Sequence, residues 1–146
     1  MGRVFRTMKS QGSKPLCGDE SFELGVTVYP HAAPDVTPDE TRCIKPGAGG
    51  MSVFAAIKQL PGRLIPARLR ELYPEDFQKA VGGDDLTIWC INIEHFRSGA
   101  NDLMLRWTAE ENPRHGSVEP SLIMRVDDMQ KSLCSTADLW EVCETP

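Results

Sequence analysis

Long hydrophobic runs are absent from this chain. No apolar stretch approaches the roughly 18 to 20 residues that span a bilayer as a helix. The first residues, Met1 to Arg6, also lack the apolar segment of a secretory signal. The sequence therefore predicts a protein without a membrane anchor and favours a cytoplasmic location.

The cysteines lack a recognisable disulfide or metal pattern. They are five in number, which is odd, and none forms a Cys-x-x-Cys pair. Without a secretion signal, reduced thiols are the expected state. Cys90 and His95 would suggest a thiol nucleophile and its base, but Cys90 lies in the most apolar segment of the chain, where a thiol usually serves as inert packing. Cysteine catalysis is therefore not expected.

An excess of positive charge is also missing. The chain has 16 Lys and Arg against 21 Asp and Glu, a net charge of −5, which argues against a nucleic-acid-binding function. The three histidines, His31, His95 and His115, have no Cys or His three to five residues further on, so no metal site is predicted. The glycine-rich loop at residues 47 to 50 lacks the Lys-Ser/Thr of a P-loop, although such a loop lets a backbone approach a ligand closely.

What the chain does contain fits one globular domain over residues 1 to 146. Its length is sufficient for a hydrophobic core without metals or disulfides. The 40% hydrophobic fraction is that of a globular protein, and 11 prolines with 12 glycines indicate many turns rather than a helical bundle. The predicted class is α+β, rich in short strands.

Local patterns predict the elements of this fold. Five segments have the composition of strands: residues 3–8, 21–29 (interrupted at Gly25), 87–93, 103–108 and 117–119. The segment at 87–93 is the most apolar, so we expect it to be central, with Ile91 buried. Helical turns are expected at residues 51–60, or a strand-to-helix corner there, at 66–72 and at 127–136. Asp127 and Gln130 have the spacing of a capping box. A loop with four prolines at 30–50 and a turn at 112–116 complete the prediction.

Three distant groups combine into one site with chemical sense. Arg6 offers a guanidinium to a diphosphate, Ser52 a hydroxyl to a ribose, and Glu119 a carboxylate to a developing cation, with His115 four residues before it. These are the parts needed to cleave an N-glycosidic bond. Each also has an ordinary explanation: a solvated charge for Arg6 and Glu119, a helix N-cap for Ser52 and a turn former for His115.

The order of several motifs resembles a known family, the small type VI secretion toxins of the Tse2 class, which is grouped with ADP-ribosyltransferase-like folds. The chain lacks the Ser-Thr-Ser triplet and the Glu-x-Glu pair of better-known arginine-serine-glutamate transferases. The motifs that carry the resemblance are Phe5-Arg6, Ser52-Val53-Phe54, Ile65-Pro66, His115, Val118-Glu119-Pro120, Met124, Gln130, Leu133 and Trp140.

The resemblance implies a fold and an activity. The fold would be ADP-ribosyltransferase-like, with short, mainly antiparallel strands in two small sheets, a few short helices, and NAD bound in a cleft between the sheets. Arg6 would hold the diphosphate and Ser52 the nicotinamide ribose, with Glu119 as the catalytic carboxylate and His115 as its alternative or helper. The reaction would be ADP-ribose transfer to a target macromolecule, or NAD hydrolysis, by a toxin acting in a target-cell cytoplasm and neutralised by a cognate immunity protein.

The competing hypothesis is a catalytically inert α+β protein-interaction module. In that case the proline-rich segment at residues 30–50 and the tryptophans Trp89, Trp107 and Trp140 would serve packing or contact with a partner. Tryptophans lie in a core more often than at an interface.

Overall fold

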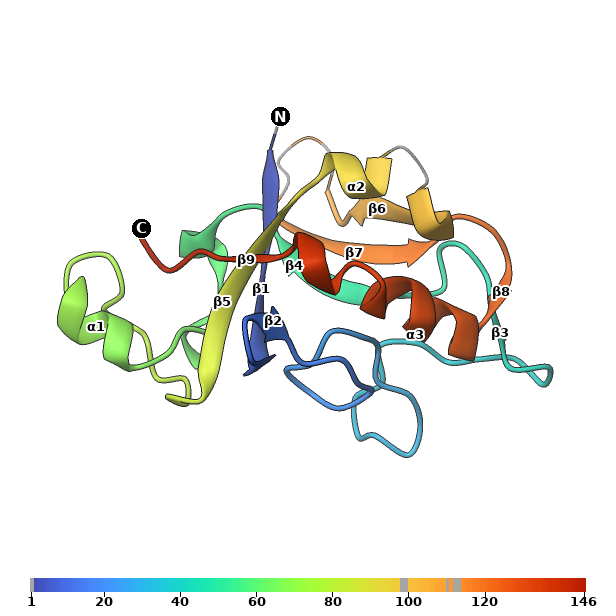
Figure 1. The fold of residues 1–146 in the computed structure, drawn as a ribbon, viewed down its shortest axis with the longest axis horizontal. Helices are drawn as coiled ribbons and strands as arrows, with labels where there is room; N and C mark the ends of the chain where they lie inside the picture. Colours follow the sequence, from blue (N-terminus) through green and yellow to red (C-terminus); the bar gives the residue numbers. More distant parts are fainter. Residues whose placement is uncertain (1, 98–99, 110, 112–113) are drawn as a thin grey trace.

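Antiparallel strands dominate the computed structural model, which describes residues 2–97, 100–109, 111 and 114–146. Among these residues, six strands follow one another in the order β6-β7-β4-β1-β5-β9, with β2 paired to β1, and a separate pair joins β3 to β8 (Figure 1). The strands are β1 (Arg3–Gln11), β2 (Lys14–Pro15), β3 (Cys43–Ile44), β4 (Met51–Phe54), β5 (Leu86–Asn92), β6 (Leu103–Trp107), β7 (His115–Pro120), β8 (Met124–Arg125) and β9 (Glu141–Val142). The prediction of an α+β domain with short, mainly antiparallel strands is confirmed.

The large sheet consists of two halves that are joined by a single residue pair. β1 pairs with β5 over seven residue pairs, and β4 pairs with β7 over four. Between the halves, β1 and β4 pair only at Phe5 and Phe54. Figure 1 shows β1 and β5 running in a clearly different direction from β4, β7 and β6. Beyond the single contact the two halves therefore diverge, as two small sheets would.

The helices are short, and they pack on both faces of the sheet. They are α1 (Arg68–Leu72), α2 (Glu94–Arg97), α3 (Val126–Cys134) and the 3-10 turns η1 (Ile57–Gln59), η2 (Gly62–Leu64), η3 (Ala100–Asp102) and η4 (Ala137–Leu139). None of the helices in the described chain could cross a bilayer.

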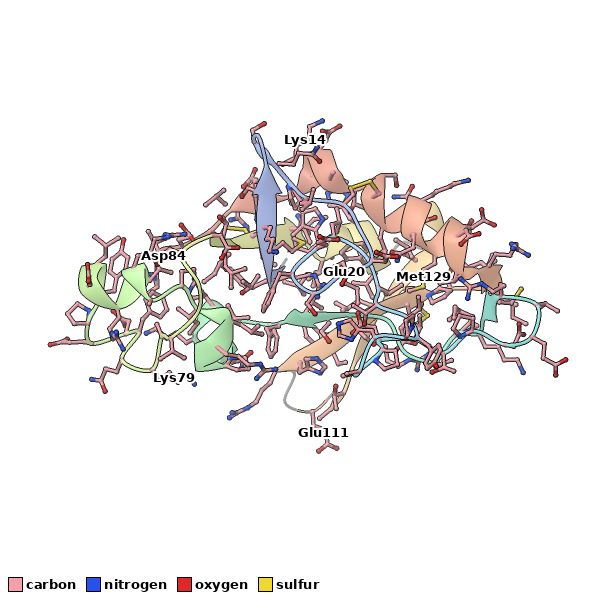
Figure 2. The ribbon with its side chains drawn as sticks, turned by 90° about the horizontal axis from the view of Figure 1, so that it is seen from below. Lys14, Glu20, Lys79, Asp84, Glu111 and Met129 are labelled. Atoms are coloured by element: carbon pink, nitrogen blue, oxygen red, sulfur yellow. A yellow bond between two sulfur atoms is a disulfide. The ribbon has the colours of Figure 1, made fainter. Side chains whose placement is uncertain are left out.

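The main core lies between the sheet and α3. Val4 and Met8 lie on the same face of β1 and are fully buried. Met129 and Leu133 of α3 are buried against this face. Figure 2 shows Met129 between α3 and the sheet. The buried residues of α3, Val126, Met129 and Leu133, recur every three to four residues, so they form one nonpolar face that packs on the sheet.

A second hydrophobic cluster forms a lobe beside the sheet. It is built by residues 57–80 and packs on Ile88, Phe5 and Phe54, so it covers the place where the two halves join. Lys79 and Asp84, labelled in Figure 2, belong to the segment between α1 and β5. In Figure 1 this lobe carries α1 and extends away from β5. It fixes the rim residues of the cleft described below.

Several sequence predictions match this structure. Residues 87–93 correspond to β5, which lies inside the sheet between β1 and β9, and Ile91 is 2% exposed. The segment at 51–60 is a strand-to-helix corner made of β4 and η1. Trp89 and Trp140 are buried and Trp107 packs against the main core, so the tryptophans serve packing.

The predicted strand at 21–29 is wrong. Leu24 and Val26 are buried as a strand would bury them, but the backbone of Val26 bonds to the Gln130 side chain instead of to a neighbouring strand. Leu24 N–H donates to the Leu16 carbonyl, and Phe22 has a positive φ of 63°. The segment is a loop whose polar backbone is satisfied by a side chain.

The predicted capping box is also wrong. The helix α3 begins one residue earlier than expected, its N-cap is Arg125, and no side chain caps it. Gln130 donates from Nε2 to the Val26 carbonyl at 2.6 Å and accepts from Val26 N–H at 2.9 Å, so it does not reach back to Asp127. The tertiary hydrogen bonds of Gln130 to Val26 thus replace the predicted local capping interaction. The predicted turn at 112–116 includes residues 112 and 113, which lie outside the described residues, while His115 and Gly116 belong to β7.

The expectation of reduced thiols is contradicted by two disulfides, Cys17–Cys134 and Cys90–Cys143. Their Cα atoms are 5.6 and 5.8 Å apart, within the usual range. The fold brings together cysteines that are 117 and 53 residues apart in sequence, which no local spacing rule detects. Cys43 remains free, which accounts for the odd number.

Candidate functional site

A pocket opens where β1 and β4 part. It has a volume of about 260 Å³ and lies between the two halves of the sheet, the loop at residues 21–35 and η2. The lining residues are Arg6, Thr7, Ser21, Phe22, Thr27, His31, Ala33, Asp35, Ser52, Phe54, Arg63 and Leu64. Two of the four predicted site residues, Arg6 and Ser52, therefore meet in this cleft.

Arg6 spans the cleft from β1. Its Nη1 donates to the Ser52 carbonyl and its Nη2 to the Glu23 carbonyl, both at 2.8 Å. The Nε atom is buried and has no hydrogen-bond partner among the residues that the structure describes. Burial lowers the pKa of Arg6 to about 10, opposed by the nearby negative charge of Asp35. Arg6 is therefore charged at neutral pH, with one buried donor still to be satisfied, and such a group attracts an anion.

Ser52 is held in place by the glycine loop that precedes β4. A Cβ at Gly50 would lie 2.2 Å from the Val118 carbonyl oxygen, and one at Gly49, whose φ is +100°, would lie 2.3 Å from the Asp35 carbonyl oxygen. Only glycine tolerates both the left-handed backbone and the close approach. The loop thus brings β4 against β7 on one side and against the segment of Asp35 on the other. The close backbone approach expected there is to the chain itself.

The loop at residues 21–35 forms one wall of the cleft, here called the far wall, and this wall is polar. The sequence did not predict its part in the site. Asp35 accepts from Thr27 N–H and donates its own N–H to Thr27 Oγ1, each at 2.9 Å. His31 Nδ1 accepts from Ala33 N–H at 3.2 Å, so the neutral ring carries its proton on Nε2, which lies 3.0 Å from Ser21 Oγ. Asp35 and His31 belong to the proline-rich segment at residues 30–50, which has no periodicity, and only the folded chain brings them to Arg6.

Glu119 lies beside this cleft, but both of its carboxylate oxygens already accept hydrogen bonds from the protein. The side chain is 3% exposed, and its Oε1 accepts from Gly47 N–H at 2.8 Å and from Arg106 Nε at 3.0 Å. Ser117 donates its hydroxyl to Oε2. One of these three donors, Arg106, is a charged guanidinium, so this hydrogen bond is charge-assisted. Glu119 is not among the described residues that line the pocket.

Strand register relates Glu119 to the other two groups. Ser52 pairs with Ser117, so Ser52, Ser117 and Glu119 point to the same face of the half-sheet. Phe5 shares that face through its pairing with Phe54, and Arg6, the next residue, points to the opposite side with Val4 and Met8. Arg6 reaches Ser52 only because β1 and β4 separate there. The structure thus brings Arg6 to Ser52, and Ser52 to the face of Glu119, without joining all three in one pocket.

His115 lies at the other end of β7. Its ring contacts Phe54 edge-on with centroids 5.1 Å apart, and its Nδ1 lies 3.1 Å from Thr108 Oγ1. Burial lowers the pKa of His115 below its ordinary value, which keeps the ring neutral at pH 7. Four strand residues separate the Cα atoms of His115 and Glu119 by roughly 13 Å. This spacing does not support His115 as a helper of Glu119.

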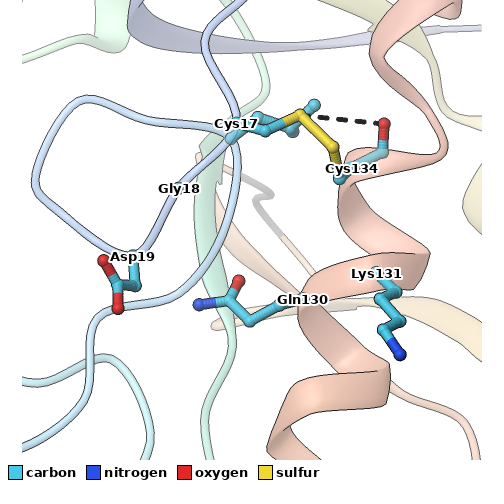
Figure 3. Close-up of a pocket in the computed structure, with 7 residues that line it drawn as sticks. Cys17, Gly18, Asp19, Gln130, Lys131 and Cys134 are labelled. Carbon is cyan, nitrogen blue, oxygen red and sulfur yellow. Dashed lines mark hydrogen bonds between the residues drawn. A yellow bond between two sulfur atoms is a disulfide. The ribbon is translucent and has the colours of Figure 1, made fainter.

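A second pocket lies behind the loop that forms the far wall. It has a volume of about 360 Å³ and is bordered by the Cys17–Cys134 disulfide and by Gln130 (Figure 3). Gln130 and the disulfide attach residues 17–26 to α3. This pocket is larger, but the charged groups among its described lining residues are limited to Asp19 and Lys131. The cleft at Arg6, with its larger set of polar and charged lining residues, is therefore the candidate site.

No family model and no curated protein matches this chain. In the described part of the chain, no group of three or more His, Cys, Asp or Glu side chains is arranged to hold a metal ion. The function is therefore inferred from the geometry of the cleft.

Proposed function

We propose that the chain is a toxin-like, NAD-dependent ADP-ribosyltransferase or NAD glycohydrolase. The observation that carries the proposal is the cleft itself: two antiparallel half-sheets touch at one residue pair and part around a buried arginine that faces Ser52. The resemblance to the toxin family implies such a cleft between two small sheets. A buried, charged guanidinium with an unsatisfied donor is suited to a diphosphate.

In this proposal each group has a defined role. Arg6 binds the diphosphate and Ser52 orients the nicotinamide ribose. The bond between the ribose carbon and the nicotinamide nitrogen breaks, nicotinamide leaves with the electron pair, and water or a nucleophile of the target attacks the ribose carbon. Glu119, which lies on the same face of the half-sheet as Ser52 and whose carboxylate accepts from three donors, stabilises the positive charge that develops on the sugar. The volume of about 260 Å³ is slightly below the usual range for ligand pockets, so one nucleotide half would occupy the cleft and the other would lie across the rim.

The proposed setting is that of a secreted effector. The chain would be delivered by type VI secretion, act on a macromolecule in a target-cell cytoplasm, and be neutralised by a cognate immunity protein. Disulfides such as Cys17–Cys134 form in oxidising compartments. This is compatible with a protein that passes through one before it acts.

The alternative is a catalytically inert α+β interaction module. The specific observation in its favour is the state of Glu119, whose carboxylate is buried and already bonded to Arg106, Gly47 and Ser117. In a purely structural role, this carboxylate would simply tie the glycine loop and β6 to β7.

Release of nicotinamide from NAD tests the proposal against this alternative. The folded wild-type chain should release nicotinamide, alone or with an extract that supplies the acceptor. Glu119→Gln should lower the rate by about a hundredfold or more, because it removes the charge opposite the developing cation. Glu40→Gln, which changes an exposed carboxylate away from the cleft, is the matched control and should leave the rate unchanged. No release by the folded wild type under either condition would favour the interaction module.

A further inference from the structure

A second arginine stands at the rim of the same cleft. Arg63 belongs to η2, lines the pocket with Arg6, and is exposed to solvent. Within the described residues it has neither an ion pair nor a side-chain hydrogen bond. Its guanidinium is thus free to bind a ligand.

The backbone beneath Arg63 is fixed although its side chain is free. Thr7 on β1 donates its hydroxyl to the Leu64 carbonyl, and Ile65 N–H donates to the Gly62 carbonyl at 3.1 Å. A Cβ at Gly62 would lie 2.2 Å from the Lys79 carbonyl oxygen, so η2 packs closely on the lobe. These contacts hold Arg63 at the edge of the opening, next to the strand that carries Arg6.

The charge balance of the cleft differs from that of the chain. The protein has a net charge of −5, yet the charged lining residues are two arginines, Arg6 and Arg63, against one carboxylate, Asp35. Among the described residues that line the cleft, the remaining titratable side chain is His31, whose Nδ1 accepts a backbone hydrogen bond. An acidic protein therefore presents a locally positive opening, which concentrates anions at this place.

We propose that Arg63 is a second phosphate-binding residue and that the cleft is built for a diphosphate rather than for a single phosphate. Arg6 lines the cleft and presents its guanidinium charge to one phosphate, and Arg63 binds the other from the rim. This inference rests on the proposed function and deepens it, since it names the ligand class as a diphosphate-bridged nucleotide. A solvated surface arginine is the ordinary alternative, and Arg70 of α1, exposed and outside the pocket lining, is an example of one.

Isothermal titration with ADP-ribose and with AMP tests the assignment. The wild type should bind ADP-ribose more tightly than AMP. Arg63→Ala should weaken ADP-ribose binding by about tenfold, the scale of one charge-assisted contact, and should leave the weaker AMP binding nearly unchanged. Arg63→Lys should recover part of the affinity, and Arg70→Ala should match the wild type. Unchanged thermal midpoints would establish that all variants are folded, as expected for exposed positions.

The outcomes separate the two proposals. Equal ADP-ribose affinity in the wild type and Arg63→Ala would overturn the role of Arg63 and leave the nucleotide site of Arg6 standing. An equal loss of affinity for AMP and ADP-ribose in Arg63→Ala would overturn the diphosphate assignment. Absence of ADP-ribose and NAD binding by the folded wild type would overturn both this inference and the proposed function.

Discussion

At the scale of single residues, burial changes the properties of the groups that matter. Burial lowers the pKa of Arg6 to about 10, against the opposing effect of Asp35, so Arg6 keeps its charge inside the protein while its Nε remains unsatisfied. His115 is affected in the opposite way, because burial favours its neutral form. Arg6→Ala is a poor test of ligand binding alone, since it would also leave the Ser52 and Glu23 carbonyls without their donor.

The neutral state of His115 leads to a prediction about pH. Because its pKa is lowered in the fold, the unfolded chain binds a proton more readily than the folded chain. The contribution of His115 to stability is therefore complete above the ordinary histidine pKa and is lost as the pH falls through its lowered pKa in the fold. Thermal midpoints measured between neutral and mildly acidic pH should fall less steeply for His115→Gln than for the wild type.

The control for this measurement is His95→Gln, which alters a histidine outside the half-sheet of β7. It should follow the wild-type pH dependence. Identical slopes for His115→Gln and the wild type would contradict the buried, neutral state of His115.

At the scale of elements, tertiary contacts decided the outcome where local patterns were ambiguous. β5 was predictable because a nearly unbroken run of nonpolar β-branched and aromatic residues favours a buried strand over other structures. It lies inside the sheet, as expected. The loop at 21–29 has a strand-like pattern but obtains its hydrogen bonds from Gln130. The same glutamine was assigned to a capping box, because sequence spacing cannot reveal a partner 104 residues away.

This reassignment predicts different costs for two substitutions in α3. Gln130→Ala should lower the free energy of unfolding by about 1 to 3 kcal/mol, since it leaves the Val26 N–H and carbonyl without partners. Asp127→Ala should cost less, about 0.3 to 1 kcal/mol, because it removes only the interaction with the helix dipole and an exposed ion pair with Arg125. Asp127 is exposed and lies 3.9 Å from Arg125. Urea unfolding measures both, and a larger cost for Asp127→Ala would restore the capping box.

At the scale of the whole molecule, two half-sheets joined at one residue pair create the cleft, and two disulfides hold the surrounding segments. Cys17–Cys134 attaches the loop of the far wall to α3, and Cys90–Cys143 attaches the C-terminal segment to β5. The sequence predicted the class of the fold and placed Arg6 and Ser52 in one site. It did not reveal Asp35, His31 or Arg63, because these residues lie in irregular segments that only the folded chain brings to the cleft.

The disulfides are open to a direct test. In protein that has not been reduced, an alkylating reagent should modify one cysteine, Cys43, after unfolding, whereas reduced protein should show five modified cysteines. The double variant Cys17→Ser/Cys134→Ser should unfold with a free energy lower by about 2 to 5 kcal/mol, because a long loop is no longer closed in the unfolded chain. Mass spectrometry gives the count, and five modified cysteines without reduction would contradict the pairing.

The central claim is that the cleft between β1 and β4 binds NAD, and calorimetric titration of the folded chain with NAD tests it most directly. The wild type should bind NAD saturably in the micromolar to millimolar range, with a matching rise in thermal midpoint. Ser52→Trp, which would fill the cleft from β4, should abolish binding while the protein remains folded. A flat titration of the folded wild type, or unchanged binding in folded Ser52→Trp, would contradict the claim.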